Sequence, residues 1–255
     1  MGTKIDTYYK TFDLKIAQQY FFNPIYTMDI LHILQKRKDI TLVSIDGNVG
    51  SGKSRLLEYI EKINPGSTCQ EDLGKWQETP LNTLQVQEKS IFELYYSNPE
   101  RFAGLFQINV LLTKFWGIVK TINDASPGST IYIERSPVID SECFARLCKK
   151  SGNMTEVEWS VYMNTYETLK FTRIIEPDFI IYLDTTPSTS FFRMKKRGRS
   201  EEKVLNIEQF ELWDTQHKKS LKNTQFLQLD ANKDLKECPQ LFNSMHTSIL
   251  TYIKK

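Results

Sequence analysis

The sequence is poor in cysteine and has no long apolar run. Its four cysteines among 255 residues are scattered, without a C-x-x-C pair. This spacing argues against a disulfide scaffold and against a zinc site built from thiolates. No uninterrupted apolar stretch approaches the roughly 18 residues that a membrane-spanning helix needs, so we expect no membrane partner. Residues 1–40 lack serine but carry four aspartates, the reverse of a transit peptide, which predicts a cytoplasmic protein.

An excess of one charge is also absent. The 33 lysines and arginines nearly balance the 31 acidic residues, so the net charge is only +2 and we expect no nucleic acid partner. Internal repeats and long Gly-, Ser- or Pro-rich linkers are missing as well. We therefore expect one domain over residues 40–255. An N-terminal extension over residues 1–39 would pack its apolar segments, YFF and DILHIL, onto this body.

Short β-rich runs alternate with longer segments of helical apolar spacing. The strand candidates are ITLVSID (40–46), STCQ (67–70), TIYIE (130–134), DFIIYLD (178–184) and QFLQLD (225–230). Helical spacing occurs in 54–63, 81–96, 100–122, 137–150, 155–173, 187–197, 206–222 and 239–253. Thr186 followed by Pro187 is a typical helix start. The alternation predicts an α/β fold with a doubly wound parallel sheet, in which ligands bind at the carboxyl ends of the strands.

The stretch IDGNVGSGKS (45–54) fits the phosphate-binding pattern G-x-x-x-x-G-K-[ST]. It follows a predicted strand and opens a predicted helix, which is the context that the pattern requires. Lys53 can supply positive charge to the β- and γ-phosphates, and Ser54 can ligate Mg²⁺. We therefore predict a P-loop NTPase-like domain that binds Mg-ATP, or another nucleoside triphosphate, through Gly47, Asn48, Val49, Gly50, Ser51, Gly52, Lys53 and Ser54.

The segment that would hold the phosphoryl acceptor is poor in arginine. Arg101 is the only arginine between residues 65 and 130, whereas an acceptor that already carries a phosphate needs guanidinium groups. Aromatic residues are frequent there, among them Trp76, Tyr96 and Phe106. This composition favours a flat, neutral acceptor held by stacking, although such rings are also typical of a helix core.

Five motifs, in order and spacing, resemble the deoxynucleoside kinase family. They are IDGNVGSGKS, EDLGKW, YSNPERFAGLFQ, IERSPVIDSECFA and KKRGRSEE, and the resemblance covers roughly residues 40–250. The family includes deoxycytidine, deoxyguanosine and deoxyadenosine kinases and mitochondrial thymidine kinase. The resemblance implies a five-stranded parallel sheet flanked by helices with a helical lid, usually in a homodimer.

The resemblance also implies roles for the residues around the reacting phosphate. Glu71 corresponds to the general base that accepts the proton of the 5′-hydroxyl, although Asp72 stands where the family usually has proline and could take the same role. Glu134 would hold Mg²⁺ together with Ser54. Arg135 would stabilise the 5′-oxygen and the transferring phosphoryl group.

The basic run RMKKRGR is expected to form a lid over the phosphates. Its arginines, Arg193, Arg197 and Arg199, would neutralise charge during transfer. In the resemblance, Glu202 and Tyr96 bind the 3′-hydroxyl of the sugar. Near the end of the chain, Asp230 opens a loop that corresponds to the adenine site of ATP, although an ordinary turn explains that segment equally well.

Selectivity for the base is expected to depend on four positions. Trp76 would stack near the acceptor, and the amide of Gln107 would pair with the edge of the base. Asp140 corresponds to an aspartate in members that prefer cytidine or purines. Lys114 stands where those members have arginine and could be the ion-pair partner of Asp140. A carboxylate accepts from an exocyclic amino group, which thymine lacks. The alternative is that Asp140 pairs with Lys149 or another surface cation.

The predicted function is therefore transfer of the γ-phosphoryl group of Mg-ATP to the 5′-hydroxyl of deoxycytidine or a purine deoxynucleoside. Three alternatives remain open at this point. They are a thymidine kinase of the same family, a nucleoside monophosphate kinase such as thymidylate kinase, and a nucleotide-binding subunit without turnover.

Overall fold

A computed structural model describes residues 30–77, 89–233 and 240–254 and contains a five-stranded parallel sheet. The strand order is β2-β3-β1-β4-β5. The strands are β1 (Thr41–Asp46), β2 (Thr68–Cys69), β3 (Thr130–Glu134), β4 (Phe179–Asp184) and β5 (Leu227–Asp230). All five predicted strands are therefore confirmed, and β3 and β4 flank the central β1. The carboxyl ends of these three strands consequently lie side by side, where an α/β sheet binds its ligands.

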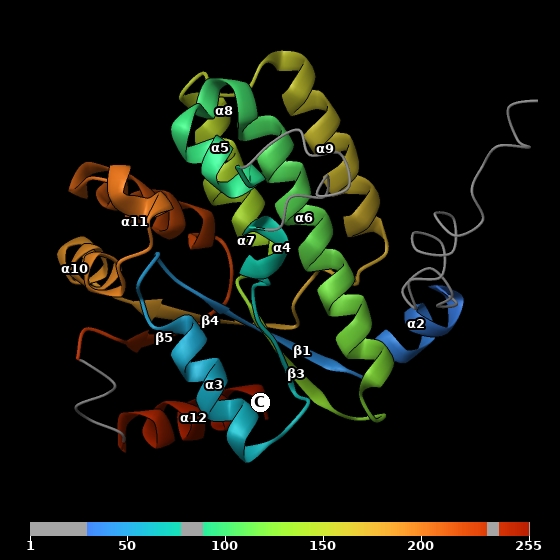
Figure 1. Cartoon of the computed structure of the whole chain (residues 1–255). Coiled ribbons are helices and arrows are strands. Elements are labelled where there is room, and N and C mark those ends of the chain that lie inside the picture. The colour runs from blue at the N-terminus through green and yellow to red at the C-terminus, as the bar shows by residue number, and fades with distance from the viewer. Residues whose placement is uncertain (1–29, 78–88, 234–239, 255) are drawn as a thin grey trace, which may run out of the picture.

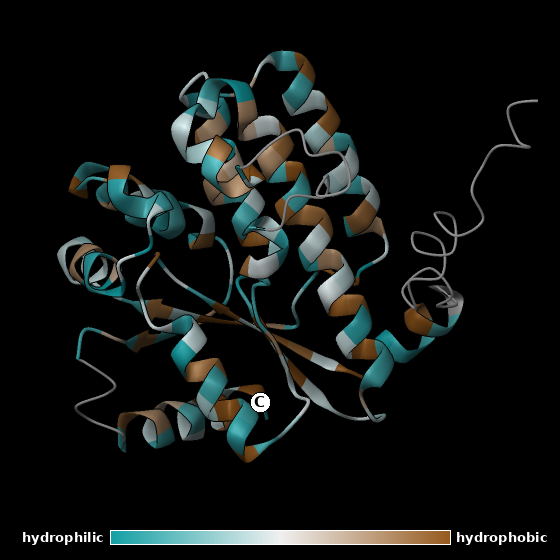
Figure 2. Cartoon of the chain, in the orientation of Figure 1, coloured by the Kyte–Doolittle hydropathy of each residue, from teal (hydrophilic) through white to brown (hydrophobic). Residues whose placement is uncertain are grey.

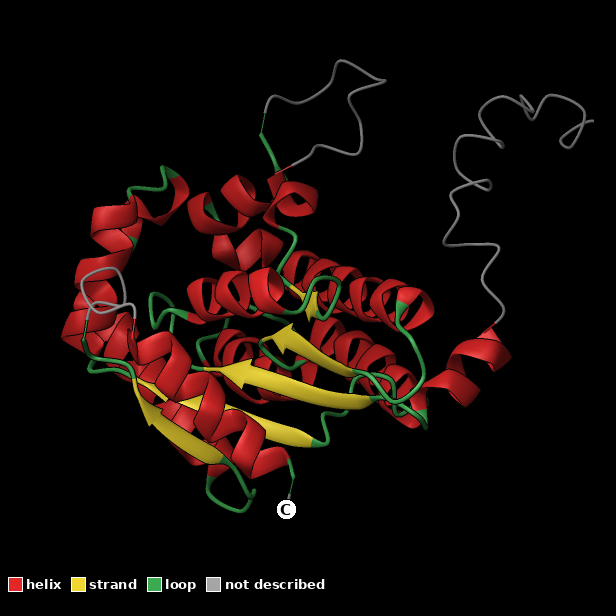
Figure 3. Ribbon diagram, turned by 90° about the horizontal axis from the view of Figure 1, so that it is seen from below, coloured by secondary structure: helices red, strands yellow, loops and turns green. Residues whose placement is uncertain are grey.

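Helices cover both faces of the sheet (Figures 1 and 3). On one face lie α3 (Lys53–Ile63) and α12 (Gln240–Ile253). The other face is covered by α6 (Pro99–Asp124) and α9 (Glu156–Phe171). The remaining helices are α2 (Ile30–Arg37), α4 (Leu73–Gln77), α5 (Ile91–Ser97), α7 (Pro137–Asp140), α8 (Arg146–Lys150), α10 (Pro187–Arg197) and α11 (Ile207–Leu221). Two short helices of other types are the π-helix η2 (Ser141–Ala145) and the 3₁₀-helix η3 (Glu201–Val204).

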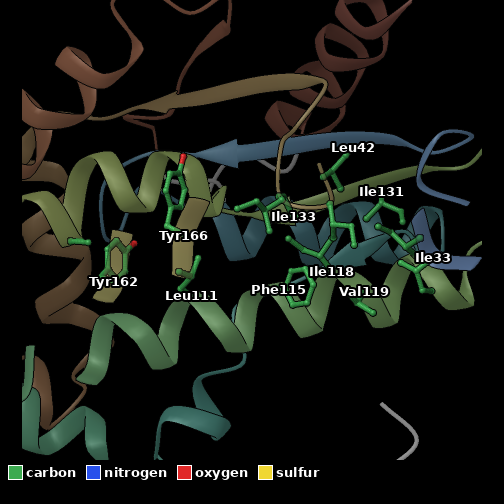
Figure 4. Packing of buried hydrophobic residues seen from close by; sticks show 14 of the residues in the cluster. Ile33, Leu42, Leu111, Phe115, Ile118, Val119, Ile131, Ile133, Tyr162 and Tyr166 are labelled. Carbon is green, nitrogen blue, oxygen red and sulfur yellow. The ribbon is translucent and has the colours of Figure 1, made fainter. Parts of the chain in front are cut away.

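Burial of the sheet on both faces explains the hydrophobic runs in the strands. Figure 2 shows the central strands mostly in brown, the hydrophobic end of the scale, whereas the helices alternate brown and teal. Toward α6, alternate strand residues such as Leu42 and Ile133 pack against Phe115 and Ile118 (Figure 4). The opposite face of the sheet packs on α3 and α12 through Val43, Ile45, Leu56, Leu57, Ile60, Ile181, Leu183, Met245 and Ile249.

Most of the predicted helices are confirmed to within about two residues, including the start at Thr186, whose hydroxyl accepts from the N–H of Thr189. The range 137–150 differs, because a π-turn at η2 interrupts it between α7 and α8. The range 81–96 falls partly outside the described residues, and α5 begins only after the capping residue Ser90. The short helix α4 was not predicted, because five residues are too few to show helical periodicity.

By length and composition, α6 alone among the described helices could cross a membrane. This is weak support for a span, because 56% of its most apolar window is buried inside the molecule. The helix lies across the sheet and supplies much of one core (Figure 4). The expected absence of a membrane partner remains a prediction.

The N-terminal segment contributes to the same core. Ile33 of α2 is fully buried in the cluster that α6 and the sheet form. The Arg37 guanidinium donates to the carbonyl oxygens of Ile40 (2.9 Å) and Glu176 (2.8 Å). The apolar segment YFF (20–22) lies outside the described residues. The boundary between an extension and the domain at residues 39 and 40 therefore stays a prediction.

Candidate active site

The loop between β1 and α3 has the backbone of a phosphate-binding loop. Gly47, Gly50 and Gly52 have φ values of 142°, 79° and 103°, in the region that favours glycine. A Cβ atom on Gly50 would lie 2.4 Å from the carbonyl oxygen of Ser190 in α10. Gly52 is also the N-cap of α3, so the free N–H groups and the dipole of this helix point toward the loop. An anion bound there would meet several N–H donors.

Polar side chains of the loop are buried and only partly matched. Lys53 is 4% exposed, and its ammonium donates to the carbonyl oxygens of Gly47 (3.0 Å) and Asn48 (2.8 Å). Burial, together with repulsion from Arg135, lowers the pKa of Lys53 to about 7. The buried hydroxyl of Ser51 has no protein partner among the described residues. A phosphate would supply the missing negative charge.

Ser54 and Glu134 meet at the ends of two elements. The Ser54 hydroxyl at the start of α3 donates to Glu134 Oε1 at the end of β3, over 2.8 Å. Burial and the negative charge of Glu71 raise the pKa of Glu134. A hydroxyl and a carboxylate side by side are hard oxygen ligands of the kind that Mg²⁺ prefers. The two residues therefore fit a magnesium ion beside the phosphate loop.

Four charged side chains meet next to this pair. Glu71 Oε1 lies 2.9 Å from Lys114 Nζ and 3.0 Å from Arg135 Nη1. Lys114 Nζ is also 3.2 Å from Asp140 Oδ2, and Arg135 Nη1 is 3.9 Å from Asp140 Oδ1. Burial alone would raise the pKa of Glu71, but Arg135, Lys114 and Lys53 outweigh it and bring the pKa to about 2. One network thus joins the predicted base to the predicted reader of the nucleobase.

The predicted base-edge residue, Gln107, is buried in α6. Its Nε2 lies 3.7 Å from the sulfur of Cys148, which is 3.5 Å from the Tyr95 hydroxyl. Neighbouring rings form one cluster, in which Tyr95 stacks on Phe106 at 4.5 Å and Trp76 meets Phe106 edge-on at 5.8 Å. These rings pack on one another as a core would and also face the cavity described below. The helix-core interpretation of these rings is therefore confirmed, and stacking against an acceptor stays a prediction.

Two arginines of the predicted lid contact Glu202, the residue that is predicted to bind the sugar. Helix α10 ends at Arg197, and Gly198 follows with a φ of 75°. Arg197 Nη2 donates to both carboxylate oxygens of Glu202, at 2.7 and 2.8 Å. Arg199 Nη1 lies 3.3 Å from the same carboxylate, which is buried in η3.

Arg193 and Asp230, two of the residues that are predicted to bind ATP, have different surroundings. The Arg193 guanidinium donates to the carbonyl oxygens of Ala231 (2.7 Å), Asn232 (3.0 Å) and Lys233 (2.8 Å). It therefore also holds the loop after β5. Asp230 accepts from the N–H and the side chain of Asn232 at the start of this loop. A contact between Asp230 and ATP stays a prediction.

A cavity of about 600 Å³ joins most of these residues, a volume typical of small-molecule sites. Among the predicted residues, those that line it are Val49, Gly50, Gly52, Lys53, Ser54, Glu71, Trp76, Tyr96, Gln107, Glu134, Arg135, Asp140, Arg193, Arg197, Arg199 and Glu202. Gly47, Asn48, Ser51, Lys114 and Asp230 do not line it. The cavity runs from the phosphate loop to the aromatic cluster, so it can hold two reactants.

Comparison with known proteins decides what this site is. The family model for deoxynucleoside kinases matches residues 43–254. The chain belongs to the deoxynucleoside kinase family. It is 31% identical to deoxycytidine kinase 2 of Gallus gallus (78% of this chain, 85% of the relative) and 27% identical to deoxycytidine kinase of Homo sapiens (78% and 86%). It is 24% identical to the mitochondrial deoxyguanosine kinase of Xenopus laevis (86% and 91%).

Membership in the deoxynucleoside kinases confirms the predicted fold and class of reaction. The chain is a phosphotransferase that moves a phosphoryl group from a nucleotide donor to a deoxynucleoside. The alternatives of a nucleoside monophosphate kinase and of a subunit without turnover are therefore set aside. The roles of individual residues stay predictions.

Two features of this deoxynucleoside kinase were not resolved by the sequence. Phe144 lines the cavity, and the Arg135 guanidinium lies 4.5 Å above its ring. Phe144 lies in the motif IERSPVIDSECFA, four residues after Asp140, but no role was assigned to it. Asp72, the alternative base, is 3.4 Å from Lys75 and lines a smaller cavity of about 340 Å³ instead.

Proposed function

We propose that this deoxynucleoside kinase uses Mg-ATP and prefers deoxycytidine or purine deoxynucleosides. The observation that carries the proposal is the buried ion pair of Asp140 and Lys114, whose carboxylate shares the cavity with Gln107. Similarity to deoxycytidine and deoxyguanosine kinases supports the same preference.

The preference follows from what a carboxylate can accept. Cytosine, adenine and guanine carry exocyclic amino groups, which donate to Asp140, whereas thymine offers a carbonyl oxygen at the corresponding edge. A site built for a donor discriminates strongly against a ligand that lacks it, because the buried acceptor is then left unpaired. Lys114 offsets the charge of Asp140 without occupying the cavity. Gln107, with two donors and one acceptor, reads the adjacent positions of the base.

Glu71 is the residue that we assign as general base. Lys114 and Arg135 both contact its Oε1, so the 5′-hydroxyl is expected to reach Oε2. A carboxylate with a pKa near 2 is a weak base toward a free alcohol. In a loose phosphoryl transfer, however, the hydroxyl becomes acidic as its oxygen bonds to phosphorus, and the proton is lost late. Glu71 then orients the hydroxyl first and accepts the proton afterwards.

Cations of the chain complete the phosphate end of the site. Lys53 would interact with the β- and γ-phosphates, and Arg135 with the transferring phosphoryl group, where fixed positive charge stabilises the transition state. Ser54 and Glu134 would hold Mg²⁺, which neutralises phosphate charge when it is bound. The roles fit the hard oxygen ligands and the incompletely matched charge of the loop.

We assign residues of the lid segment to contacts with both reactants, the phosphate donor and the nucleoside. Arg197 and Arg199 pair with Glu202 in the structure and lie on the wall of the cavity. We assign the 3′-hydroxyl of the sugar to Glu202 and Tyr96. Contact of the lid arginines with phosphates would leave the Glu202 carboxylate to accept from the sugar.

We also propose a cytoplasmic homodimer that binds neither nucleic acid nor membrane. The near-neutral charge supports the absence of a nucleic acid partner. The homodimer is proposed because members of the family usually form one.

A steady-state panel tests the preference. Values of kcat/KM are measured with Mg-ATP for deoxycytidine, deoxyadenosine, deoxyguanosine, thymidine and thymidine monophosphate. We expect at least one amino-bearing nucleoside to exceed thymidine by about tenfold or more, the scale of one lost polar contact. Thymidine as the best substrate would refute the assignment of Asp140.

The variant Asp140→Ala sharpens this test, with Asp124→Ala as the matched control. Asp124 is an exposed carboxylate at the end of α6, far along the helix from the aromatic cluster. We expect D140A to lower kcat/KM for amino-bearing nucleosides and to raise the relative rate with thymidine. D124A should keep the order of the wild type, and an unchanged order in D140A would contradict the proposal.

A further inference from the structure

Asp46, the last residue of β1, has no role in the phosphate-binding pattern, yet it contacts the backbone directly after Arg135. Its side chain is fully buried, and a buried carboxylate is costly without hydrogen-bond donors. Oδ1 accepts from the backbone N–H of Ser136 over 3.2 Å, and Oδ2 accepts from the hydroxyl of Ser44. Ser136 follows β3, so this carboxylate connects the carboxyl ends of two neighbouring strands.

Arg135 directly precedes Ser136, and its backbone is strained. Its φ of 56° lies in the left-handed region, which is unfavourable for a residue with a side chain. The N–H of Arg135 donates to the carbonyl oxygen of Ile45 over 3.0 Å, and the next N–H donates to Asp46. Consecutive residues of β1 therefore hold the peptide groups on both sides of the Arg135 Cα atom. Since these peptides set the direction of the side chain, they aim the guanidinium at Glu71.

We propose that Asp46 is a positioning residue, which acts on phosphoryl transfer by holding the Arg135–Ser136 backbone in place. It touches neither reactant, since it does not line the cavity. The proposal rests on the role assigned to Arg135 above. Burial raises the pKa of Asp46 to about 6, against the opposing effects of the Ser44 hydrogen bond and the charge of Arg135. The carboxylate is thus mostly ionised at neutral pH and accepts at both oxygens.

A rival explanation follows from the position of Asp46 in the chain. It directly precedes Gly47, so its removal could instead disturb the phosphate loop or the fold as a whole. A double-mutant cycle separates these explanations, because a residue that acts through Arg135 has nothing left to act on once that arginine is gone. The cycle compares wild type, Asp46→Ala, Arg135→Ala and the double variant, with deoxycytidine and Mg-ATP.

We expect D46A alone to lower kcat by about tenfold or more, the scale of one lost hydrogen bond to a charged acceptor. In the R135A background the same substitution should lower kcat by less than about twofold, with the KM for ATP within about threefold throughout. An equal loss in both backgrounds would assign the effect to the phosphate loop or the fold and overturn the proposal. If R135A alone keeps full activity, the assigned role of Arg135 fails first, and the proposal fails with it.

Two further variants keep the test decisive if D46A unfolds. Asp46→Asn retains an oxygen that accepts from Ser136 and gains a donor for Ser44, so it should recover most of the kcat lost in D46A. A D46N enzyme as slow as D46A would overturn the hydrogen-bond mechanism. Ser44→Ala removes only the hydroxyl that orients Asp46. It should lower kcat by about two- to fivefold beside Arg135 and leave kcat unchanged in R135A, and the same loss in both would also overturn the proposal.

Discussion

At the scale of single residues, the site concentrates opposite charges around Glu71. Lys114 and Arg135 both contact one of its carboxylate oxygens, within 3.0 Å. Glu71→Gln keeps the shape of the side chain but cannot accept the proton, so we expect kcat to fall by roughly 10²–10⁴-fold. Binding of ATP, measured by equilibrium titration, should be unchanged. Asp72→Asn is the matched control, and a large loss of kcat there with normal activity in E71Q would transfer the role to Asp72.

Lys53 gives the site a pH-dependent affinity for the donor. Its pKa is about 7 because of burial and of repulsion from Arg135, far below the usual lysine value near ~10.4. Phosphates favour the charged form, so binding above pH 7 requires that Lys53 take up a proton. The Kd for ATP should therefore rise with pH between about 7 and 9, by up to about tenfold per pH unit. The variant Lys53→Met should bind more weakly at pH 7 and show a flatter dependence; the same slope in both proteins would contradict this assignment.

The lowered lysine pKa has a matching effect on stability. Between the folded value near 7 and the unfolded value near ~10.4, the unfolded chain binds more protons than the folded one at Lys53. The contribution of Lys53 to the free energy of unfolding therefore rises with pH across this window. The pKa of Glu71 is also lowered, to about 2, so the stability that this carboxylate contributes is lost only as the pH falls from about 4 toward 2.

At the scale of elements, hydrophobic periodicity predicted the strands and long helices well. Runs such as TIYIE and DFIIYLD are buried on both faces, and this burial determines their composition. The π-turn at η2 was not predictable, because one extra residue in a turn leaves the apolar spacing of 137–150 almost unchanged. The individual site residues could be named from motifs, and so could the pairing of Lys114 with Asp140, but the rest of their network could not. Glu71, Lys114 and Asp140 come from three separate segments, and only the tertiary fold brings them within hydrogen-bond distance.

The contact between the phosphate loop and α10 predicts a difference between two glycines. Gly50 and Gly128 have similar φ values, 79° and 77°, so alanine strains the backbone about equally at both. A Cβ atom at Gly50 would also lie 2.4 Å from the Ser190 carbonyl oxygen. A Cβ atom at Gly128 would meet no other atom within 4 Å. Gly128→Ala should thus lower Tm by only about 2–8 °C and spare the KM for ATP. Gly50→Ala should lower Tm further and raise that KM by tenfold or more, the scale of about 1.4 kcal/mol.

Thermal unfolding followed by circular dichroism, together with the KM for ATP, checks this pair. Equal effects of the two substitutions would mean that α10 shifts freely to accommodate the side chain. The close approach of loop and helix would then have no energetic consequence.

At the scale of the whole molecule, the parallel sheet explains why one cavity holds all of the chemistry. The ends of β1, β3 and β4 deliver the phosphate loop, the Glu134–Arg135 pair and the helix that leads to the lid. On α6 and α9, the molecule instead exposes apolar side chains. Leu105 and Leu112 of α6 are 56% and 36% exposed, and Val157 and Val161 of α9 are 74% and 49% exposed.

These side chains form the surface that we expect to bury in the homodimer. The two helices approach closely, since a Cβ atom on Gly104 would lie 3.1 Å from the side chain of Glu158. Leu105 follows Gly104 and Val157 precedes Glu158, so both side chains belong to one apolar patch. Such patches are typical of protein interfaces. A dimer would remove this area from water at a gain of roughly 25 cal/mol per Å². Multi-angle light scattering should then give twice the chain mass of 29.8 kDa for the wild type.

Charge placed in the patch should separate the protomers. The double variant Val157→Glu and Val161→Glu adds two carboxylates from each copy. Because a buried unpaired charge is strongly unfavourable, we expect this variant to have the mass of a single chain at micromolar concentration. The matched control is Val204→Glu, since Val204 is 65% exposed but lies in η3 by the lid, where no contact between copies is expected. It should keep the wild-type mass. A dimer that survives both glutamates would show that α9 lies outside the interface, and a wild type of single-chain mass would remove the homodimer from the proposed function while leaving the kinase site intact.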